Sequence, residues 1–302
     1  MAPDADLIGV TDNDSTAGTL DAIAYLKAKA EARGAPLVVN MSFGSYFGPR
    51  DGTSNLERGL DNLAASGMIL VASAGNESDR PVRAVGTIAQ GEVVTVGFRV
   101  LADVKESGNL EVWYPGTQAY GISITGPGCA ATEVVEAGAG PKSFATACAK
   151  IDIVSTGPQA NNDDRQIKVT LTPVSGQTVL LEGAWSLTLI GTKVPGGTSP
   201  FSIICSESGK DLRFTDHTAA VTEQILTDTS SAKRVLAVGA HNTRYSWNSL
   251  NGPYTAPSSF GPIGDLTSYS SRGPRRTCSN AAKCPPVMKP EIAAPDAWIQ
   301  ST

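Results

Sequence analysis

Two hydrophobic patterns alternate along the first 80 residues of the chain. Residues 7–10, 37–41 and 68–72 are short apolar runs without regular polar alternation, which is typical of strands covered on both faces. Between these runs, apolar residues recur at helical spacing, from N-cap candidates at 14–16 to Gly34, and from Ser54 or Asn55 to Gly67. Strands and helices in this order predict an α/β fold with a parallel sheet and right-handed crossovers.

The pattern changes between residues 81 and 231. Strand-like runs lie at 93–100, 110–114, 122–124, 168–171, 185–189 and 201–204, and turn residues separate them about every 10 residues. This spacing predicts an antiparallel β-sandwich. Two features in this region leave alternatives open. The acidic pair in loop 159–165 indicates either a calcium site or a solvated turn. The aromatic residues Trp113, Tyr114, Tyr120 and Trp185 form either a ligand-binding face or part of the core.

The first pattern returns after residue 230, with a buried strand at 234–240 and a further segment at 289–295. We therefore predict that residues 1–80 and 232–302 form one α/β unit, whose sheet is incomplete. Residues 81–231 then form a β-sandwich domain inserted into it. An incomplete sheet exposes apolar faces or edges, so self-association through this core is also expected.

Composition excludes several classes of protein. The 302 residues are 41% hydrophobic and 18% charged, a balance typical of globular proteins. The formal net charge of −5 gives no electrostatic reason to expect nucleic acid or an anionic membrane as a partner. Apolar runs fall well short of the roughly 18 residues that a membrane helix needs, and the chain opens without a basic-then-apolar leader.

The five cysteines give weak information about chemistry and compartment. Cys278 and Cys284 lie close together in a polar loop, where a disulfide and two free thiols are both compatible with the sequence. The chain has neither C-x₂-C pairs nor histidines near its cysteines, so we expect no zinc site, and we expect no other metal or cofactor. Cysteines in polar loops favour an oxidising, extracellular setting.

The stretch 69–76, ILVASAGN, ends a buried strand with a glycine and an amide. In open parallel sheets, functional residues gather at the carboxyl ends of the strands, which is where Asn76 falls. Gly75 permits a sharp turn or a close approach of the backbone to a ligand. A side-chain amide in this place is a standard donor to the oxyanion formed in acyl transfer. The alternative is that Gly75 and Asn76 form an ordinary turn.

Six sequence blocks that follow one another in order favour the functional interpretation of Asn76 over the ordinary turn. They are residues 38–44 (VVNMSFG), the helix after them, 72–76 (ASAGN), 235–240 (VLAVGA), 268–274 (SYSSRGP) and 289–295 (KPEIAAP). Together they resemble the subtilisin-like serine peptidases, over about half of the chain. The resemblance implies hydrolysis of a polypeptide substrate through an acyl-enzyme. It also implies three roles: Asn76 as the oxyanion-hole amide, Ser42, Phe43 and Gly44 as the edge that pairs with the substrate backbone, and Ser73, Ala74 and Gly75 as the lining of the P1 pocket.

The Ser-His-Asp triad that this family uses is not recognisable in the chain. The family's Asp lies in a D-x-G strand and its His in an H-G-T segment, both expected before Met1, and its nucleophile lies in G-T-S-x-A-x-P, expected after Thr302. His217 and His241 stand in other contexts and are expected to be surface polar residues. Asp296 stands where the family usually has Gly. We therefore interpret the chain as an internal fragment of a catalytic domain that is inactive by itself.

A β-sandwich inserted after the oxyanion loop is also similar in layout to the clostridial spore-germination subtilases, which carry a jelly roll at this point. The leading hypothesis is thus a fragment of a secreted or cell-surface subtilisin-like endopeptidase. The alternative is a non-catalytic pseudoprotease or binding module, in which the sandwich engages a protein or glycan partner. Sequence alone gives neither the cleavage preference nor the natural substrate.

Overall fold

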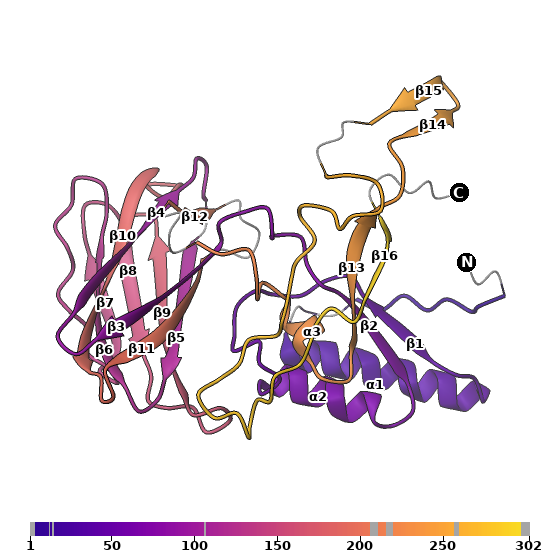
Figure 1. The fold of residues 1–302 in the computed structure, drawn as a ribbon, viewed down its shortest axis with the longest axis horizontal. Coiled ribbons are helices and arrows are strands. Elements are labelled where there is room, and N and C mark those ends of the chain that lie inside the picture. Colours follow the sequence, from indigo (N-terminus) through magenta and orange to yellow (C-terminus); the bar gives the residue numbers. More distant parts are fainter. Residues whose placement is uncertain are drawn as a thin grey trace.

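A four-stranded parallel sheet forms one half of the molecule (Figure 1). The computed structural model describes residues 4–11, 13, 15–105, 107–205, 211–215, 220–256 and 260–296. The sheet order is β1-β2-β13-β16, and every neighbouring pair is parallel. Its strands are β1 (Val38–Met41), β2 (Ile69–Ser73), β13 (Leu236–Asn242) and β16 (Ile292–Asp296). The predicted parallel sheet is therefore present.

Two helices cover one face of this sheet. Both begin, and α1 also ends, where local sequence signals predict, whereas α2 ends at Ala64, before the predicted Gly67. Helix α1 (Thr16–Arg33) starts at Ser15, whose hydroxyl accepts a hydrogen bond from the Gly18 N–H, and ends at the left-handed Gly34. Helix α2 (Asn55–Ala64) starts with a capping box formed by Ser54 and Glu57. Apolar side chains from the helices and strands share one core: Ile23, Val39, Met41, Leu56, Leu60, Met68, Leu70, Ala72, Ala232 and Val235.

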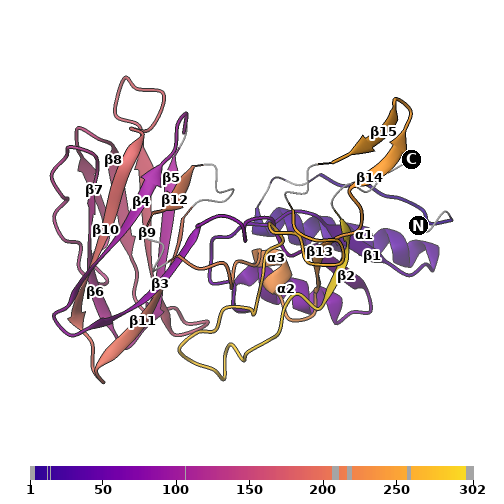
Figure 2. The same cartoon turned by 45° about the horizontal axis from the view of Figure 1, so that its top comes forward.

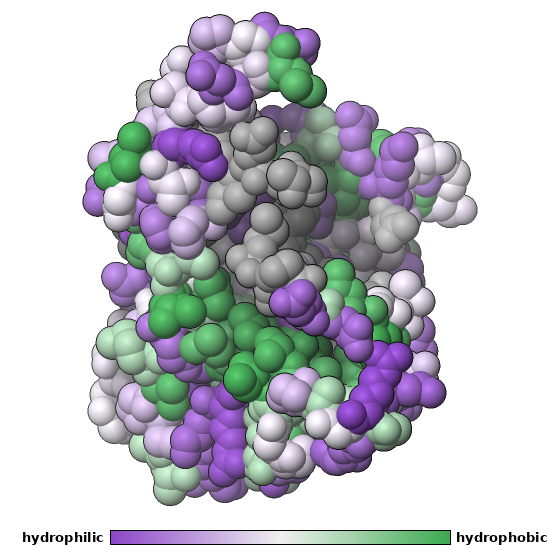
Figure 3. All heavy atoms as spheres, turned by 90° about the vertical axis from the view of Figure 1, so that its right-hand side faces the viewer, coloured by the Kyte–Doolittle hydropathy of each residue, from purple (hydrophilic) through white to green (hydrophobic). Residues whose placement is uncertain are grey.

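The opposite face of the sheet is uncovered in the described part of the chain. Val38, Ile69 and Ile292 point away from the helices and are 61%, 56% and 49% exposed. Figure 3 shows a continuous hydrophobic area on this side of the molecule. The expected strand at 7–10 is wrong, because no described strand pairs with it, and Leu7 is 94% exposed. Apolar residues form a strand only where a neighbour takes up their backbone hydrogen bonds.

Two antiparallel sheets pack on each other in the other half of the molecule (Figures 1 and 2), and we call this part the sandwich. One sheet has the order β12-β4-β10-β6, and the other β3-β11-β5-β9-β8-β7. The strands are β3 (Arg83–Ala89), β4 (Val93–Val100), β5 (Gly108–Pro115), β6 (Ala119–Thr125), β7 (Gly140–Ala145), β8 (Lys150–Ser155), β9 (Asp164–Thr172), β10 (Gly183–Lys193), β11 (Thr198–Cys205) and β12 (Leu212–Phe214). Buried residues from both sheets form one shared core.

All six strand-like runs predicted for this region are strands, and β3, β7, β8 and β12 were missed. Strand β7 lies at the edge of its sheet and its residues are exposed or half-buried, so it has no hydrophobic signal. Tyr114, Tyr120 and Trp185 belong to the core, as one of the two readings predicted, and the rings of Tyr114 and Tyr120 stack with centroids 4.1 Å apart. Trp113 is buried as well, but on the outer face of its sheet.

Shorter elements complete the described chain. A four-residue helix, α3 (Asp228–Ser231), follows the sandwich. The hairpin of β14 (Ser246–Ser249) and β15 (Gly252–Thr255) projects from the parallel sheet (Figure 1), with the rings of Trp247 and Tyr254 4.9 Å apart. No described helix is long and apolar enough to cross a membrane.

Two disulfides are present. The bond between Cys278 and Cys284 settles the alternative left open for that loop, and a second bond joins Cys129 to Cys148. The second pair was not foreseen, because its members lie 19 residues apart and only the packing of the sandwich brings them together. Cys205 is a buried free thiol, and burial raises its pKa well above the usual value.

Polar side chains join the sandwich to the parallel-sheet half, at what we call the junction: Arg50, Asp51, Asn162, Asp164 and Arg276. The Arg276 guanidinium donates to Asp51 and to Asp164, each at 2.8 Å, and Asn162 donates to Asp51 at 3.0 Å. The two members of the acidic pair in loop 159–165 differ. Asp164 is 2% exposed, so the solvated-turn reading is wrong for it, whereas Asp163 is half-exposed and forms an ion pair with Lys283 at 2.6 Å. The Asp164 carboxylate already binds a guanidinium, which would repel a calcium ion.

Candidate functional site

The segments 42–44 and 73–76 leave the parallel sheet at the same edge. Strands β1 and β2 are parallel neighbours, and Met41 is aligned with Ala72, so the residues that follow both strands emerge side by side. They include every residue that the sequence singled out for a role: Ser42, Phe43, Gly44, Ser73, Ala74, Gly75 and Asn76. Strand order thus brings together two segments that lie about 30 residues apart in the chain.

The backbone just after β2 is fully engaged. The Ala74 N–H donates to the Val238 carbonyl at 2.9 Å, which continues the pairing with β13. Thr227, the N-cap of α3, donates its N–H to the Ala74 carbonyl at 3.1 Å and its hydroxyl to the Ser73 carbonyl at 3.0 Å. The carbonyls of Ser73 and Ala74 are therefore both engaged within the chain, and the Ala74 side chain is buried.

Tyr46 and Ser271 hold the Gly75–Asn76 turn. Gly75 has φ +114°, and a Cβ on it would lie 2.2 Å from the Tyr46 hydroxyl and 2.7 Å from the Ser271 Oγ, so no larger residue fits. The Asn76 N–H donates to the Tyr46 hydroxyl at 2.7 Å, and the Ser271 N–H donates to the Gly75 carbonyl at 2.8 Å. Tyr46 is buried, and burial raises the pKa of its phenol, which therefore stays neutral and keeps its acceptor role.

The Asn76 side chain has a different environment from its backbone. Asn76 is exposed, and within the described ranges no residue forms a hydrogen bond with its carboxamide. The backbone of this residue is thus fixed while its amide faces solvent at the carboxyl edge of the sheet. Because the carboxamide has no partner among the described residues, its N–H groups are available to an external acceptor.

The other strand end forms one side of a cavity. Phe43 is 49% exposed, and its carbonyl accepts a hydrogen bond from the Thr229 hydroxyl at 2.9 Å. A Cβ on Gly44 would lie 2.7 Å from both Thr227 Cβ and Thr229 Oγ1. The cavity has a volume of about 350 Å³ and is lined by Ser15, Thr16, Thr19, Phe43, Gly44, Ser45, Leu56, Asp228 and Thr229. Sequence reasoning missed segment 227–229, whose one local signal is the N-cap pattern Thr227-Asp228.

The remaining predicted residues fall away from this edge or outside the described part. His241 lies in β13 and is half-buried, not a fully exposed surface residue, and His217 lies outside the described residues. Asp296, at the end of β16, accepts a hydrogen bond from the Tyr269 hydroxyl at 2.9 Å. Burial first, and this carboxylate second, raise the pKa of Tyr269 to about 12. Asp296, which stands where the resembled family usually has Gly, thus has a hydrogen-bond partner in Tyr269.

One group of metal-ligand side chains occurs in the described part of the chain, and it is already in use. It consists of Asp51, Cys278 and Cys284. The two sulfur atoms form a disulfide, so neither is a thiolate, and Asp51 accepts hydrogen bonds from Arg276 and Asn162. This group therefore does not fit a metal ion in the state described.

Comparison with known proteins identifies the family. Residues 1–184 match the model of the subtilase family, Peptidase S8. The chain belongs to the subtilase family. No curated protein matches the chain. Among solved structures, it is similar to the CspB protease of Clostridium perfringens, with a TM-score of 0.73 and 21% sequence identity. The alignment covers 95% of this chain and 54% of that one, so the chain spans about half the length of this relative, and the likeness concerns the fold.

Proposed function

We propose that this chain is the part of a subtilisin-like serine endopeptidase that binds the substrate backbone and stabilises the oxyanion. The observation that carries the proposal is the exposed Asn76 carboxamide at the carboxyl edge of the parallel sheet, on a turn that Tyr46 and Ser271 hold. Membership of the subtilase family and a fold similar to that of a protease support it. The substrate class is a polypeptide.

Each segment at the edge then has a role in acyl transfer. When a nucleophile attacks the scissile carbonyl, the oxygen gains negative charge, and the Asn76 Nδ2 donates to it more strongly than to the uncharged carbonyl. Ser42, Phe43 and Gly44, beyond the end of β1, pair with the extended substrate backbone. Ser73, Ala74 and Gly75 line the side of the pocket for the P1 side chain. Because Thr227 occupies the carbonyls of residues 73 and 74, this pocket selects by shape.

The nucleophile and its general base are proposed to lie outside residues 1–302, so the chain by itself is expected not to cleave peptides. Residues 81–231 are proposed to be an inserted domain of the jelly-roll type. The two disulfides are consistent with a secreted or cell-surface location. A fluorophosphonate probe tests the first point: no serine of the folded chain should be labelled. Labelling that disappears when the chain is denatured beforehand would show a nucleophile within these residues.

The substitution Asn76→Leu in the complete peptidase tests the oxyanion role. Leucine keeps the size of the side chain and removes the donor, so kcat should fall by about 10²–10³-fold while KM changes little. This magnitude is the one known for subtilisin itself, a member of the same family, and is taken over as such. A matched control is Asn55→Leu, an exposed asparagine at the start of α2.

The two readings of Asn76 give opposite results in this experiment. If Asn76 were only a turn residue, Asn76→Leu would lower the melting temperature and leave the turnover of the folded fraction nearly unchanged. In a non-catalytic scaffold, the complete protein would show no turnover before the substitution. Measuring kcat on protein that circular dichroism shows to be folded therefore separates the endopeptidase from both alternatives.

A further inference from the structure

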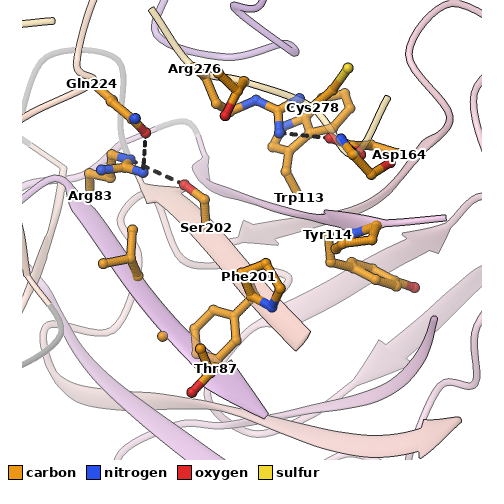
Figure 4. A pocket seen from close by; sticks show the side chains of 16 residues that line it. Arg83, Thr87, Trp113, Tyr114, Asp164, Phe201, Ser202, Gln224, Arg276 and Cys278 are labelled. Carbon is orange, nitrogen blue, oxygen red and sulfur yellow. Dashed lines mark hydrogen bonds and ion pairs between the residues drawn. The ribbon is translucent and has the colours of Figure 1, made fainter. Parts of the chain in front are cut away.

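A second cavity lies between the sandwich and the segment 276–279, next to the junction (Figure 4). It has a volume of about 470 Å³. Much of its lining is apolar, including Val85, Trp113, Pro115, Pro200 and Phe201. Its charged lining consists of the guanidinium groups of Arg83 and Arg276 and the carboxylate of Asp164, which is paired with Arg276. Thr87, Thr277 and Ser279 also line it and are exposed, so the cavity can be reached from solvent.

Arg83 is buried in this lining without a carboxylate partner. It is 6% exposed, and its guanidinium donates to the Ser202 hydroxyl at 3.1 Å, the Glu223 carbonyl at 3.0 Å and the Gln224 Oε1 at 2.7 Å. All three acceptors are neutral, and no ion pair of Arg83 occurs within the described ranges. These bonds use three of the five N–H groups of the guanidinium, which leaves two for a ligand.

Arg50 is a second buried arginine that contacts Gln224, although it does not line the cavity itself. It is 2% exposed and donates to the Gln224 backbone carbonyl at 3.1 Å. Arg50 therefore binds the backbone of Gln224, and Arg83 binds its side chain. The Arg50 Nε is buried, and no acceptor for it occurs in the described part of the chain. Burial first, and repulsion from other guanidinium groups second, lower the pKa of Arg83 to about 9 and that of Arg50 to about 10.

Arg276 lines the same cavity but, unlike Arg83, is paired with carboxylates. It contacts two carboxylates, Asp51 and Asp164, and its guanidinium carbon lies 5.0 Å from the centre of the Trp113 ring. Arg276 is thus paired with two carboxylates, whereas Arg83 has only neutral hydrogen-bond partners. Nearby carboxylates offset part of the cost of this burial: Glu111, Glu57 and Asp228 act on Arg50, and the exposed Glu223 acts on Arg83. Among the described residues, however, no carboxylate forms an ion pair with Arg83, whose hydrogen bond to Glu223 is to the backbone carbonyl.

The Arg83 guanidinium, which has no ion pair within the described ranges, and the apolar walls together indicate the kind of ligand. A buried cation without a counter-ion is costly, and an anion that enters the cavity would relieve that cost through charge-assisted hydrogen bonds. Walls of Trp113, Phe201 and proline favour an anion whose charge sits on an apolar body over a strongly hydrated inorganic one. We propose that this cavity binds an organic carboxylate, with Arg83 as its anion-binding residue. This site is separate from the edge that carries Asn76 and does not depend on peptidase activity.

Benzoate and its neutral isostere benzamide test the proposal on the full chain. Benzoate should bind saturably in isothermal titration calorimetry and shift the indole N–H resonance of Trp113, while benzamide should bind at least about tenfold more weakly. Inorganic phosphate should also bind more weakly than benzoate. Equal binding of benzamide, tighter binding of phosphate, or no saturable benzoate binding in the millimolar range would each overturn the proposal.

The substitution Arg83→Gln should weaken benzoate binding by about tenfold or more, because it removes the charge and retains only part of the hydrogen bonding. A matched control is Arg99→Gln, a half-exposed arginine of the sandwich that pairs with Glu182 and should leave benzoate affinity unchanged. Unchanged affinity in folded Arg83→Gln would overturn the proposal. If that variant does not fold, the comparison of benzoate with benzamide and the Trp113 resonance on the unmodified chain still decide it.

Discussion

The hydroxyl group of Tyr46 is the part of the oxyanion turn that can be removed most cleanly. Tyr46→Phe deletes one atom, which accepts the Asn76 N–H at 2.7 Å and lies 3.4 Å from the Ser271 Oγ. The ring itself packs with Val82, Ile204 and Ile225 and should stay in place, because phenylalanine has the same apolar shape. The substitution therefore tests the hydrogen bond and not the packing.

The expected loss of stability follows from the group that is left without a partner. An unsatisfied buried N–H costs about 1–3 kcal/mol, and because Asn76 is exposed, water can reach part of this turn. We therefore expect the free energy of unfolding to fall by about 1–2 kcal/mol in urea titrations. The effect should be local, so that amide hydrogen exchange at Asn76 accelerates by about tenfold while β4 and β10 keep their protection.

Tyr25→Phe is the matched control, because Tyr25 is 50% exposed on α1. It should change neither the free energy of unfolding nor the exchange at Asn76. In the complete peptidase, Tyr46→Phe should lower kcat less than Asn76→Leu does, since the carboxamide is retained. Unchanged exchange at Asn76 in Tyr46→Phe would refute the idea that Tyr46 holds this turn.

Two further predictions concern pH and the division of the chain. Burial, and then the neighbouring Asp51, raise the pKa of Glu57 from 4.5 to about 7. The folded chain holds this proton more tightly than the unfolded one. The contribution of Glu57 to stability is therefore greatest below pH 4.5 and decreases by about 3 kcal/mol as pH rises from 4.5 to 7. Glu57→Gln should flatten this part of the profile in urea titrations, and an unchanged slope would contradict the assignment. Residues 81–231 expressed alone should melt cooperatively as a monomer, whereas the full chain should self-associate in sedimentation through its uncovered face, and Ile69→Lys should reduce that association. A fragment that does not fold, or a full chain that stays monomeric, would count against these expectations.

Features that depend on neighbours in the sequence could be predicted from the sequence. The starts of α1 and α2 at Ser15 and Ser54 follow from side-chain oxygens that accept backbone N–H groups three residues on. Strands β1 and β2 follow from apolar runs, and their parallel pairing follows from the helices between them. The position of Asn76 at the carboxyl edge of the sheet follows from the same pattern.

Features that depend on contacts between distant segments required the tertiary structure. Tyr46 meets Asn76 across 30 residues, and Asp164 meets Arg276 across 112. Residues 7–10 would form a strand only beside another strand that accepts and donates their backbone hydrogen bonds. Asp164 is shielded from solvent because distant residues, including Arg276, pack against it. Arg83 and Arg50 look like ordinary surface arginines in the sequence, and only the tertiary structure shows that both are buried and bind the same residue, Gln224. Side-chain type and spacing determine local backbone structure, but burial and pairing are properties of the surroundings, which the fold alone decides.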